Sequence, residues 1–253
     1  GMASRIAKRR LRRVLSRVPL CLTIGIAMQE EFSRRLNKPC VAVGNAVDTA
    51  DFEMERRPNT GHRRRIAYVG GLHLGRSVVL EEVGRALGVL AQSASDWEIQ
   101  VYCPAADFES HREILGRVGV TWGGCVSPED VPKTLIDADA LLFVESSVSS
   151  IAAFTRLSVS TKVPQYLAAR RPVLVVGPRG QGSIEEFRSV SDGIVIVEGG
   201  SPPALERGIR DLLAMDLGQS GVGRILPSRF EAEPTRARFG QALTHAASAG
   251  RGL

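Results

Sequence analysis

Short apolar runs alternate with amphipathic stretches along most of the chain, and this pattern predicts the order of its strands and helices. The expected strands cover 66–70, 98–102, 120–122, 140–144, 173–176 and 194–197. The helices expected after them cover 77–91, 108–117, 128–136, 161–169, 183–189 and 203–215. Strands separated by helices pair in parallel through right-handed crossovers.

The fold class that follows is α/β, a Rossmann-like doubly wound parallel sheet of about six strands with helices on both faces. Composition agrees with this prediction. Hydrophobic residues make up 43% of the 253-residue chain but aromatic residues only 5%, so the core rests on Val, Leu, Ile and Ala. That palette is typical of a parallel sheet buried under helices.

The ends of the chain follow a different pattern. An apolar stripe predicts a helix over 3–17, which Pro19 ends, and further elements are expected at 20–24 (strand), 27–36 (helix) and 40–43 (strand). Polar and basic residues over 53–64 read as a linker, and 229–249 allows a last helix. The domain boundaries expected from this are 1–52, 53–64 (linker), 65–228 (the Rossmann-like domain) and 229–253 (helix and tail).

Charge is concentrated at the start of the chain. The net charge is +6, yet seven basic residues lie in the first seventeen positions, so the rest is close to neutral. Such a local excess does not argue for a nucleic-acid-binding fold, and no nucleic-acid partner is expected. A helix over 3–17 with a basic and an apolar side allows peripheral contact with a membrane surface, here the inner face. The favoured alternative is a surface helix of a preceding domain.

The remaining bulk features point to a cytoplasmic protein. No run approaches the ~18 apolar residues that cross a bilayer. The four cysteines have neither a CxxC pair nor a histidine at ligand spacing, and we expect reduced thiols and no zinc site.

Residues 158–178 carry the strongest chemical signal. They read as a polar loop, a short helix, a turn and a buried strand. A helix start has unpaired N–H groups and a partial positive charge, and Lys162 in the first turn adds a cation. This combination suits a phosphate or diphosphate. The alternative is a lysine that simply extends into solvent.

Two more segments follow expected strands, at the sheet edge where ligands bind in this fold. Gly70 and Gly71 allow a tight backbone turn, and Arg76 precedes a helix; the alternative is a surface turn with a solvated arginine. The Ser-rich segment 145–160 is expected to be a long loop, either functional or weakly ordered.

The segment from Ser158 to Pro178, which reads SVSTKVPQYLAARRPVLVVGP, resembles the S-x-P-x-K-x-x-E-Y-L-A-x-G-x-P-V-L signature of GT-B glycosyltransferases. The signature belongs to the C-terminal lobe of the retaining, family 4 type. The resemblance implies that Thr161 and Lys162 bind the diphosphate of a nucleotide-sugar and that Gln165 binds its ribose. Ser158 and Arg156 then belong to the loop that faces the donor sugar.

The loop GGLHLGR, from Gly70 to Arg76, resembles the family's VGxLxxxKG/R loop, which implies that Gly70, Gly71 and Arg76 also contact the diphosphate. The nucleotide-sugar is a substrate, so the resemblance implies no cofactor. It also implies no metal, because helix dipoles and basic residues neutralise the leaving diphosphate.

One departure from the family is chemically important. The family's glutamate-x7-glutamate pair falls on Leu157 and Gln165. A carboxylate accepts hydrogen bonds from both ribose hydroxyls, whereas an amide offers one acceptor and one donor group. Weaker donor binding, altered specificity and lost activity all remain open. The alternative function is therefore a non-catalytic Rossmann-like binding or partner module derived from a glycosyltransferase.

Residues 23–52, which include NAVDTADF from Asn45 to Phe52, resemble the end of a GT-B N-terminal domain and its "vpNGVDxxxF" crossover. This implies a donor-binding lobe that carries the tail of a neighbouring lobe, supplied elsewhere or by a partner chain. The implied activity is transfer of a sugar from a nucleotide diphosphate donor to a carbohydrate or lipid-linked acceptor. No catalytic residue is assigned, and His73 is interpreted as a loop residue.

Overall fold

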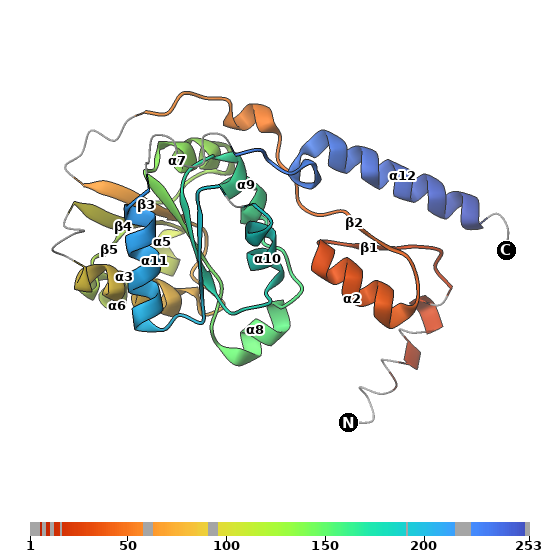
Figure 1. Cartoon of the computed structure of the whole chain (residues 1–253), viewed down its shortest axis with the longest axis horizontal. Helices are drawn as coiled ribbons and strands as arrows, with labels where there is room; N and C mark the ends of the chain where they lie inside the picture. Colours follow the sequence, from red (N-terminus) through yellow and green to blue (C-terminus); the bar gives the residue numbers. More distant parts are fainter. Residues whose placement is uncertain are drawn as a thin grey trace.

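Val, Ile, Leu and Ala make up most of the central strands of the main body, and these strands are buried along most of their length. The computed structural model describes residues 6, 9–10, 13–15, 17–57, 63–90, 96–190, 192–215 and 224–250. Figure 1 shows a parallel sheet between layers of helices. Its strands are β3 (Arg64–Val69), β4 (Trp97–Tyr102), β5 (Val120–Gly124), β6 (Ala140–Val144), β7 (Val173–Gly177) and β8 (Ile194–Glu198). The predicted fold class is confirmed.

The strand order is β5-β4-β3-β6-β7-β8, with every pair parallel. The chain therefore builds outward from β3 in one direction, returns, and builds outward from β6 in the other. This order places a topological switch point between β3 and β6. In open α/β sheets, ligands bind outside the carboxyl ends of the strands at such a point.

Alternate residues of each strand pack on opposite faces of the sheet. In β3, Ile66 and Tyr68 join one core and Ala67 and Val69 join the other. The helices that supply the first core are α3 (Arg76–Val89), α5 (Ala105–Glu109), α6 (Arg112–Arg117) and α11 (Pro202–Leu213). Those that supply the second are α7 (Val131–Asp137), α9 (Lys162–Ala168) and α10 (Gly182–Arg188).

A smaller unit lies beside this body (Figure 1). It contains the two-stranded parallel sheet of β1 (Cys21–Thr23) and β2 (Cys40–Ala42), with α2 (Ile26–Leu36) between the strands. The 3₁₀ turn η1 (Thr49–Phe52) follows β2. After the main body, the chain continues through the 3₁₀ turn η3 (Ser228–Phe230) into the helix α12 (Ala232–Gly250). The amide of Ala232 donates to the carbonyl of Val47 at 2.9 Å, which ties the start of α12 to the chain that leaves the smaller unit.

The structure corrects three predicted elements. Segment 145–160 is not a continuous loop, because α8 (Ser149–Thr155) forms within it. The helix expected over 108–117 is divided into α5 and α6, and Ser110 donates its hydroxyl hydrogen to the carbonyl of Ala106 where α5 ends. The helix expected over 128–136 begins with a 3₁₀ turn, η2 (Pro128–Asp130), before α7.

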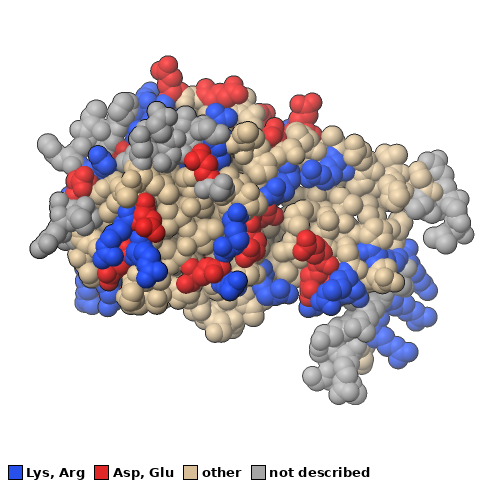
Figure 2. Space-filling view, in the orientation of Figure 1, with Lys and Arg blue, Asp and Glu red and all other residues tan. Residues whose placement is uncertain are grey.

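Most of the helix expected over 3–17, and residues 58–62 of the expected linker, lie outside the described residues. Figure 2 shows basic side chains gathered near the N-terminal end and mixed charge over the rest of this face, consistent with the local charge excess in the sequence. Within the described part of the chain, no helix has both the length and the apolar character needed to cross a membrane.

Candidate functional site

The carboxyl ends of β3 and β6 present a cluster of charged and polar groups at the switch point of the sheet. The two strands are paired through Ile66–Ala140 and Ala67–Leu141. The loop after β3 leads into α3, and the segment after β6 leads through α8 into α9. Both connections therefore leave the sheet at the same edge, where a ligand would bind.

Glycine shapes the loop after β3. Gly70 has a φ of +140°, a conformation that side-chain-bearing residues rarely adopt. A Cβ atom at this position would lie 2.2 Å from both Cε and Nζ of Lys162. Gly70 therefore supplies the space in which the Lys162 side chain lies. The next turn is fixed by Tyr68, whose hydroxyl donates to the carbonyl of Gly71 at 2.8 Å.

Lys162, the first residue of α9, reaches back to the end of β3. Its Nζ donates to the hydroxyl of Tyr68 at 3.1 Å and lies 4.6 Å from the centre of the Tyr68 ring. Burial lowers the pKa of Lys162 to about 7, and the positive charge of Arg76 adds to this effect, while Glu145 opposes it. The ammonium form is thus held in a place that penalises its charge, and an anionic ligand would relieve that penalty.

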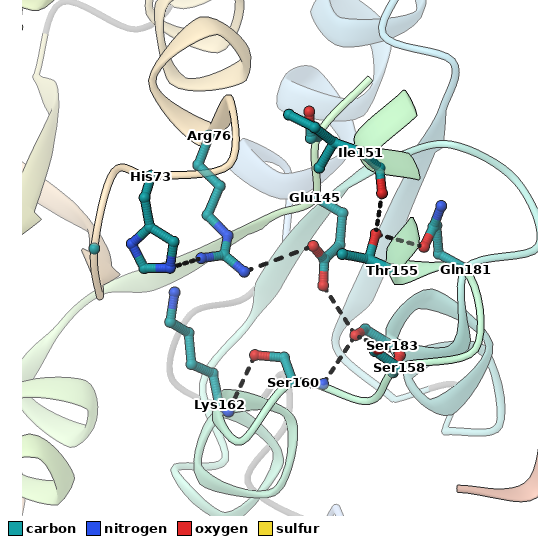
Figure 3. Close-up of polar contacts among 12 residues, drawn as sticks. His73, Arg76, Glu145, Ile151, Thr155, Ser158, Ser160, Lys162, Gln181 and Ser183 are labelled. Carbon is teal, nitrogen blue, oxygen red and sulfur yellow. Dashed lines mark hydrogen bonds and ion pairs between the residues drawn. The ribbon is translucent and has the colours of Figure 1, made fainter. Parts of the chain in front are cut away.

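Arg76, the first residue of α3, lies on the other side of the site. Figure 3 shows its guanidinium between His73 and Glu145. Nη1 lies 3.3 Å from Nε2 of His73, and Nη2 lies 3.8 Å from Oε2 of Glu145. The Arg76 side chain is only 12% exposed. Two cations, Arg76 and Lys162, therefore belong to one polar cluster although they come from two separate helices.

Glu145 is buried at the carboxyl end of β6, 6% exposed. Its Oε1 accepts a hydrogen bond from the hydroxyl of Ser183 at 2.9 Å, and the Ser183 oxygen in turn accepts from the amide of Ser160 at 3.0 Å (Figure 3). This chain of contacts joins β6, α10 and the start of α9. The arrangement suits an oxygen-rich anion that bridges Arg76 and Lys162. The oxygens of Glu145 and Ser183 lie at the edge of this cluster.

Comparisons with known proteins agree with this architecture. No protein-family model and no curated protein sequence matches the chain. Among solved structures, α,α-trehalose 6-phosphate synthase from Burkholderia multivorans matches with a TM-score of 0.69 at 12% identity, over 96% of this chain and 62% of its own. S. aureus TarM, as a G117R mutant with Fondaparinux, alpha-GlcNAc-glycerol and UDP, has a TM-score of 0.65 at 11% identity, over 93% and 46%.

Sucrose-phosphate synthase from Thermosynechococcus elongatus is a third neighbour, with a TM-score of 0.64 at 16% identity, over 94% of this chain and 61% of its own. The fold is that of a GT-B glycosyltransferase lobe. The chain spans between 46% and 62% of the length of these three neighbours.

Within this GT-B lobe, Gly70 lies against Lys162, Gly71 is hydrogen-bonded to Tyr68, which Lys162 also contacts, and Arg76 lies in the same cluster beside Glu145. Thr161 lies exposed directly before α9. The backbone amides that follow it already have internal acceptors. The amide of Lys162 donates to the hydroxyl of Ser160 at 3.4 Å, and that of Val163 donates to the Ser160 carbonyl at 3.1 Å. The cationic side chains, rather than these amides, are thus the groups available to an anion.

The other predicted residues of the lobe lie at the margin of the cluster or away from it. Gln165 is partly exposed, one turn along α9 from Lys162. The carbonyl of Ser158 accepts from the hydroxyl of Ser183 at 3.4 Å. Arg156, in contrast, forms an ion pair with Glu31 of α2 at 3.6 Å. The structure therefore places Arg156 against the smaller unit instead of beside Lys162.

Sequence reasoning gave no role to Tyr68 or Ser183, included Glu145 only as a member of the segment 145–160, and interpreted His73 only as a loop residue. Two signals were present. Tyr68 is the polar-tipped residue two positions before the glycine pair, and Glu145 is the first polar residue after a wholly apolar strand.

Among the described residues, no group of three or more His, Cys, Asp or Glu side chains is arranged to hold a metal ion.

Proposed function

We propose that this chain is the nucleotide-sugar-binding lobe of a glycosyltransferase of the retaining, family 4 type. The observation that carries the proposal is the meeting of Arg76 and Lys162 at the switch point between β3 and β6. Two cations beside a glycine-lined loop match the charge and size of a diphosphate. The likeness of the fold to glycosyltransferases, one of them with UDP bound, supports the same substrate class.

In this proposal each predicted residue has a separate task. Gly70 and Gly71 allow the backbone to approach the diphosphate, while Arg76, Thr161 and Lys162 bind its oxygens. Gln165 contacts the ribose, and its amide supplies one acceptor and one donor group. Ser158 lies toward the donor sugar, and Arg156 takes part there after leaving its ion pair with Glu31.

The chemistry proposed for the site is stabilisation of a leaving group. Sugar transfer passes through an oxocarbenium-like transition state, in which negative charge develops on the departing diphosphate. Arg76 and Lys162 are already in place before the bond breaks, so little reorganisation accompanies the reaction. These cations neutralise the diphosphate without a metal ion or a cofactor.

The acceptor, a carbohydrate or a lipid-linked sugar, is proposed to bind to a second lobe that is provided elsewhere in the chain or by a partner. The cytoplasm is the proposed compartment, because the proposed substrate is a nucleotide-sugar. A second candidate function is a non-catalytic binding or partner module. Gln165 favours it, because an amide replaces the carboxylate that the resemblance implies at the ribose site.

A transfer assay tests the proposal. We expect the purified chain alone to leave nucleotide-sugars and sugar acceptors unjoined, because positioning of the acceptor can account for about 7–11 kcal/mol of a barrier. A two-lobe protein that contains this sequence should transfer sugar, as detected by mass spectrometry. Robust transfer by the chain alone contradicts the need for a second lobe. Nucleotide binding with no transfer by the two-lobe protein supports the non-catalytic module.

A further inference from the structure

A buried acid lies inside the otherwise cationic site. The side chain of Glu145 is 7% exposed, and its two carboxylate oxygens have different surroundings. Oε1 accepts the hydrogen bond from Ser183, whereas Oε2 faces Arg76 at 3.8 Å, beyond hydrogen-bond distance. Glu145 is therefore fixed on one side and keeps a charged oxygen directed at the cation that is proposed to hold the diphosphate.

The surrounding backbone holds Glu145 in this position. Gly177, at the end of β7, leaves room for it, because a Cβ atom there would lie 3.0 Å from Cβ of Glu145. Ser183 is itself fixed by the amide of Ser160. A carboxylate is costly to bury unless it is paired and hydrogen-bonded, and Arg76 and Ser183 meet both conditions.

Glu145 changes the charge that a ligand meets. Arg76 and Lys162 contribute positive charges when both are protonated, and Glu145 removes one unit of charge within the same cluster. A diphosphate esterified at both ends carries about two negative charges. A free nucleoside diphosphate carries about three at pH 7, because the second pKa of a terminal phosphate is about 6. The additional charge is repelled by a nearby carboxylate.

We propose that Glu145 selects ligands by charge, favouring a nucleoside diphosphate that is esterified to a sugar over one with a free terminal phosphate. This inference rests on the proposed function and adds a determinant of specificity to it. The donor is bound with little repulsion. The product, which gains a charge when the sugar leaves, is bound less well and departs more readily.

The test compares the two ligand classes in wild type and Glu145→Gln. Glutamine keeps the size of the side chain and the acceptor for Ser183, but it removes the charge. Isothermal titration at pH 7, where Lys162 is still partly protonated, uses whichever of UDP, GDP, ADP, CDP and dTDP binds most tightly, together with its sugar esters. We expect the affinity for the free diphosphate to rise about tenfold and that for the best ester to rise less than about threefold.

Glu185→Gln is the matched control. It removes the same charge from α10, where Glu185 is 42% exposed and pairs with Arg188, and it should change neither affinity more than about twofold. Glu145→Met, which removes the charge and the hydrogen bond together, serves as a second variant if glutamine prevents folding. It should shift the ratio of the two affinities in the same direction.

Each outcome distinguishes the inference from the function on which it rests. An equal change in affinity for both ligands, or a loss of affinity for both, contradicts charge selection. The proposed nucleotide-binding function is not contradicted by that result. Binding of the free diphosphate by Glu145→Gln but not by wild type supports charge selection. No binding of any nucleotide to either protein contradicts both proposals.

Discussion

Replacing Lys162 with methionine is expected to weaken nucleoside diphosphate binding by about one to two orders of magnitude at pH 7. Hydrogen bonds to charged groups contribute about 1.5–3 kcal/mol, and Lys162 offers one from a site that excludes much of the solvent. Methionine is an unbranched apolar side chain that fills the space of the lysine stem, and it removes the ammonium that lies over the ring of Tyr68. Isothermal titration measures the loss.

The control for Lys162→Met is Arg207→Met, which removes a positive charge from an exposed position of α11. Its affinity should stay within about twofold of wild type, because exposed charges contribute little. If both substitutions weaken binding equally, the effect is one of overall charge, and Lys162 has no direct contact with the ligand.

The same lysine predicts a dependence on pH. Its pKa is lowered to about 7 by burial and by Arg76, so Lys162 in the free chain is neutral well above pH 7. A bound diphosphate favours the ammonium form, and binding therefore takes up a proton. Affinity should fall as pH rises from 7.5 to 9, by up to about tenfold per unit. Below pH 7 the lysine is already charged and adds no slope. The affinity of Lys162→Met should stay constant from pH 7.5 to pH 9.

Gly70→Ala is expected to abolish most of the same binding without removing any charge. The added Cβ would lie 2.2 Å from the end of the Lys162 side chain, which must leave its place beside Tyr68. The φ of +140° also strains an alanine at this position, at about 1–3 kcal/mol of stability. We expect at least tenfold weaker binding by titration and a lower thermal midpoint.

Two comparisons show whether Gly70→Ala acts through Lys162. In Gly70→Ala/Lys162→Met the two losses should be less than additive, because the part of the Gly70→Ala loss that acts through the lysine is already absent. Gly88→Ala, in α3, is the control for adding a methyl group. A Cβ atom there meets no other atom within 4 Å, and alanine in a helix is stabilising by about 0.5–1 kcal/mol. Additive losses in the double variant would contradict the steric mechanism.

The sheet was predictable from sequence because its strands are short apolar runs that helices separate. Strands such as β6 and β7 are buried on both faces, so their residues are apolar at every position and stand out from the amphipathic helices. α8 was not predictable in the same way. Serine at 146, 147, 149 and 150 favours a loop, yet α8 forms over Ser149–Thr155, with Ile151 near Gly75.

The candidate site was predictable only as far as topology fixes it. Parallel strands bring the loop after β3 and the start of α9 to one edge, and Gly70, Arg76 and Lys162 meet there for that reason. The side chain of Arg156 points toward Glu31, which is far away in the sequence, and no local sequence pattern predicts this ion pair. The burial of Glu145 between Ser183 and Arg76 likewise depends on packing of α10 and α3 against the sheet.

The most direct test of this account is titration of the purified chain with UDP, GDP, ADP, CDP and dTDP. The central claim is that the polar cluster at the carboxyl ends of β3 and β6 binds a nucleoside diphosphate through Arg76 and Lys162. We predict that at least one of the five binds at a single site and that Lys162→Met removes most of its affinity. Absence of binding by all five, or binding that Lys162→Met leaves unchanged, would contradict the claim.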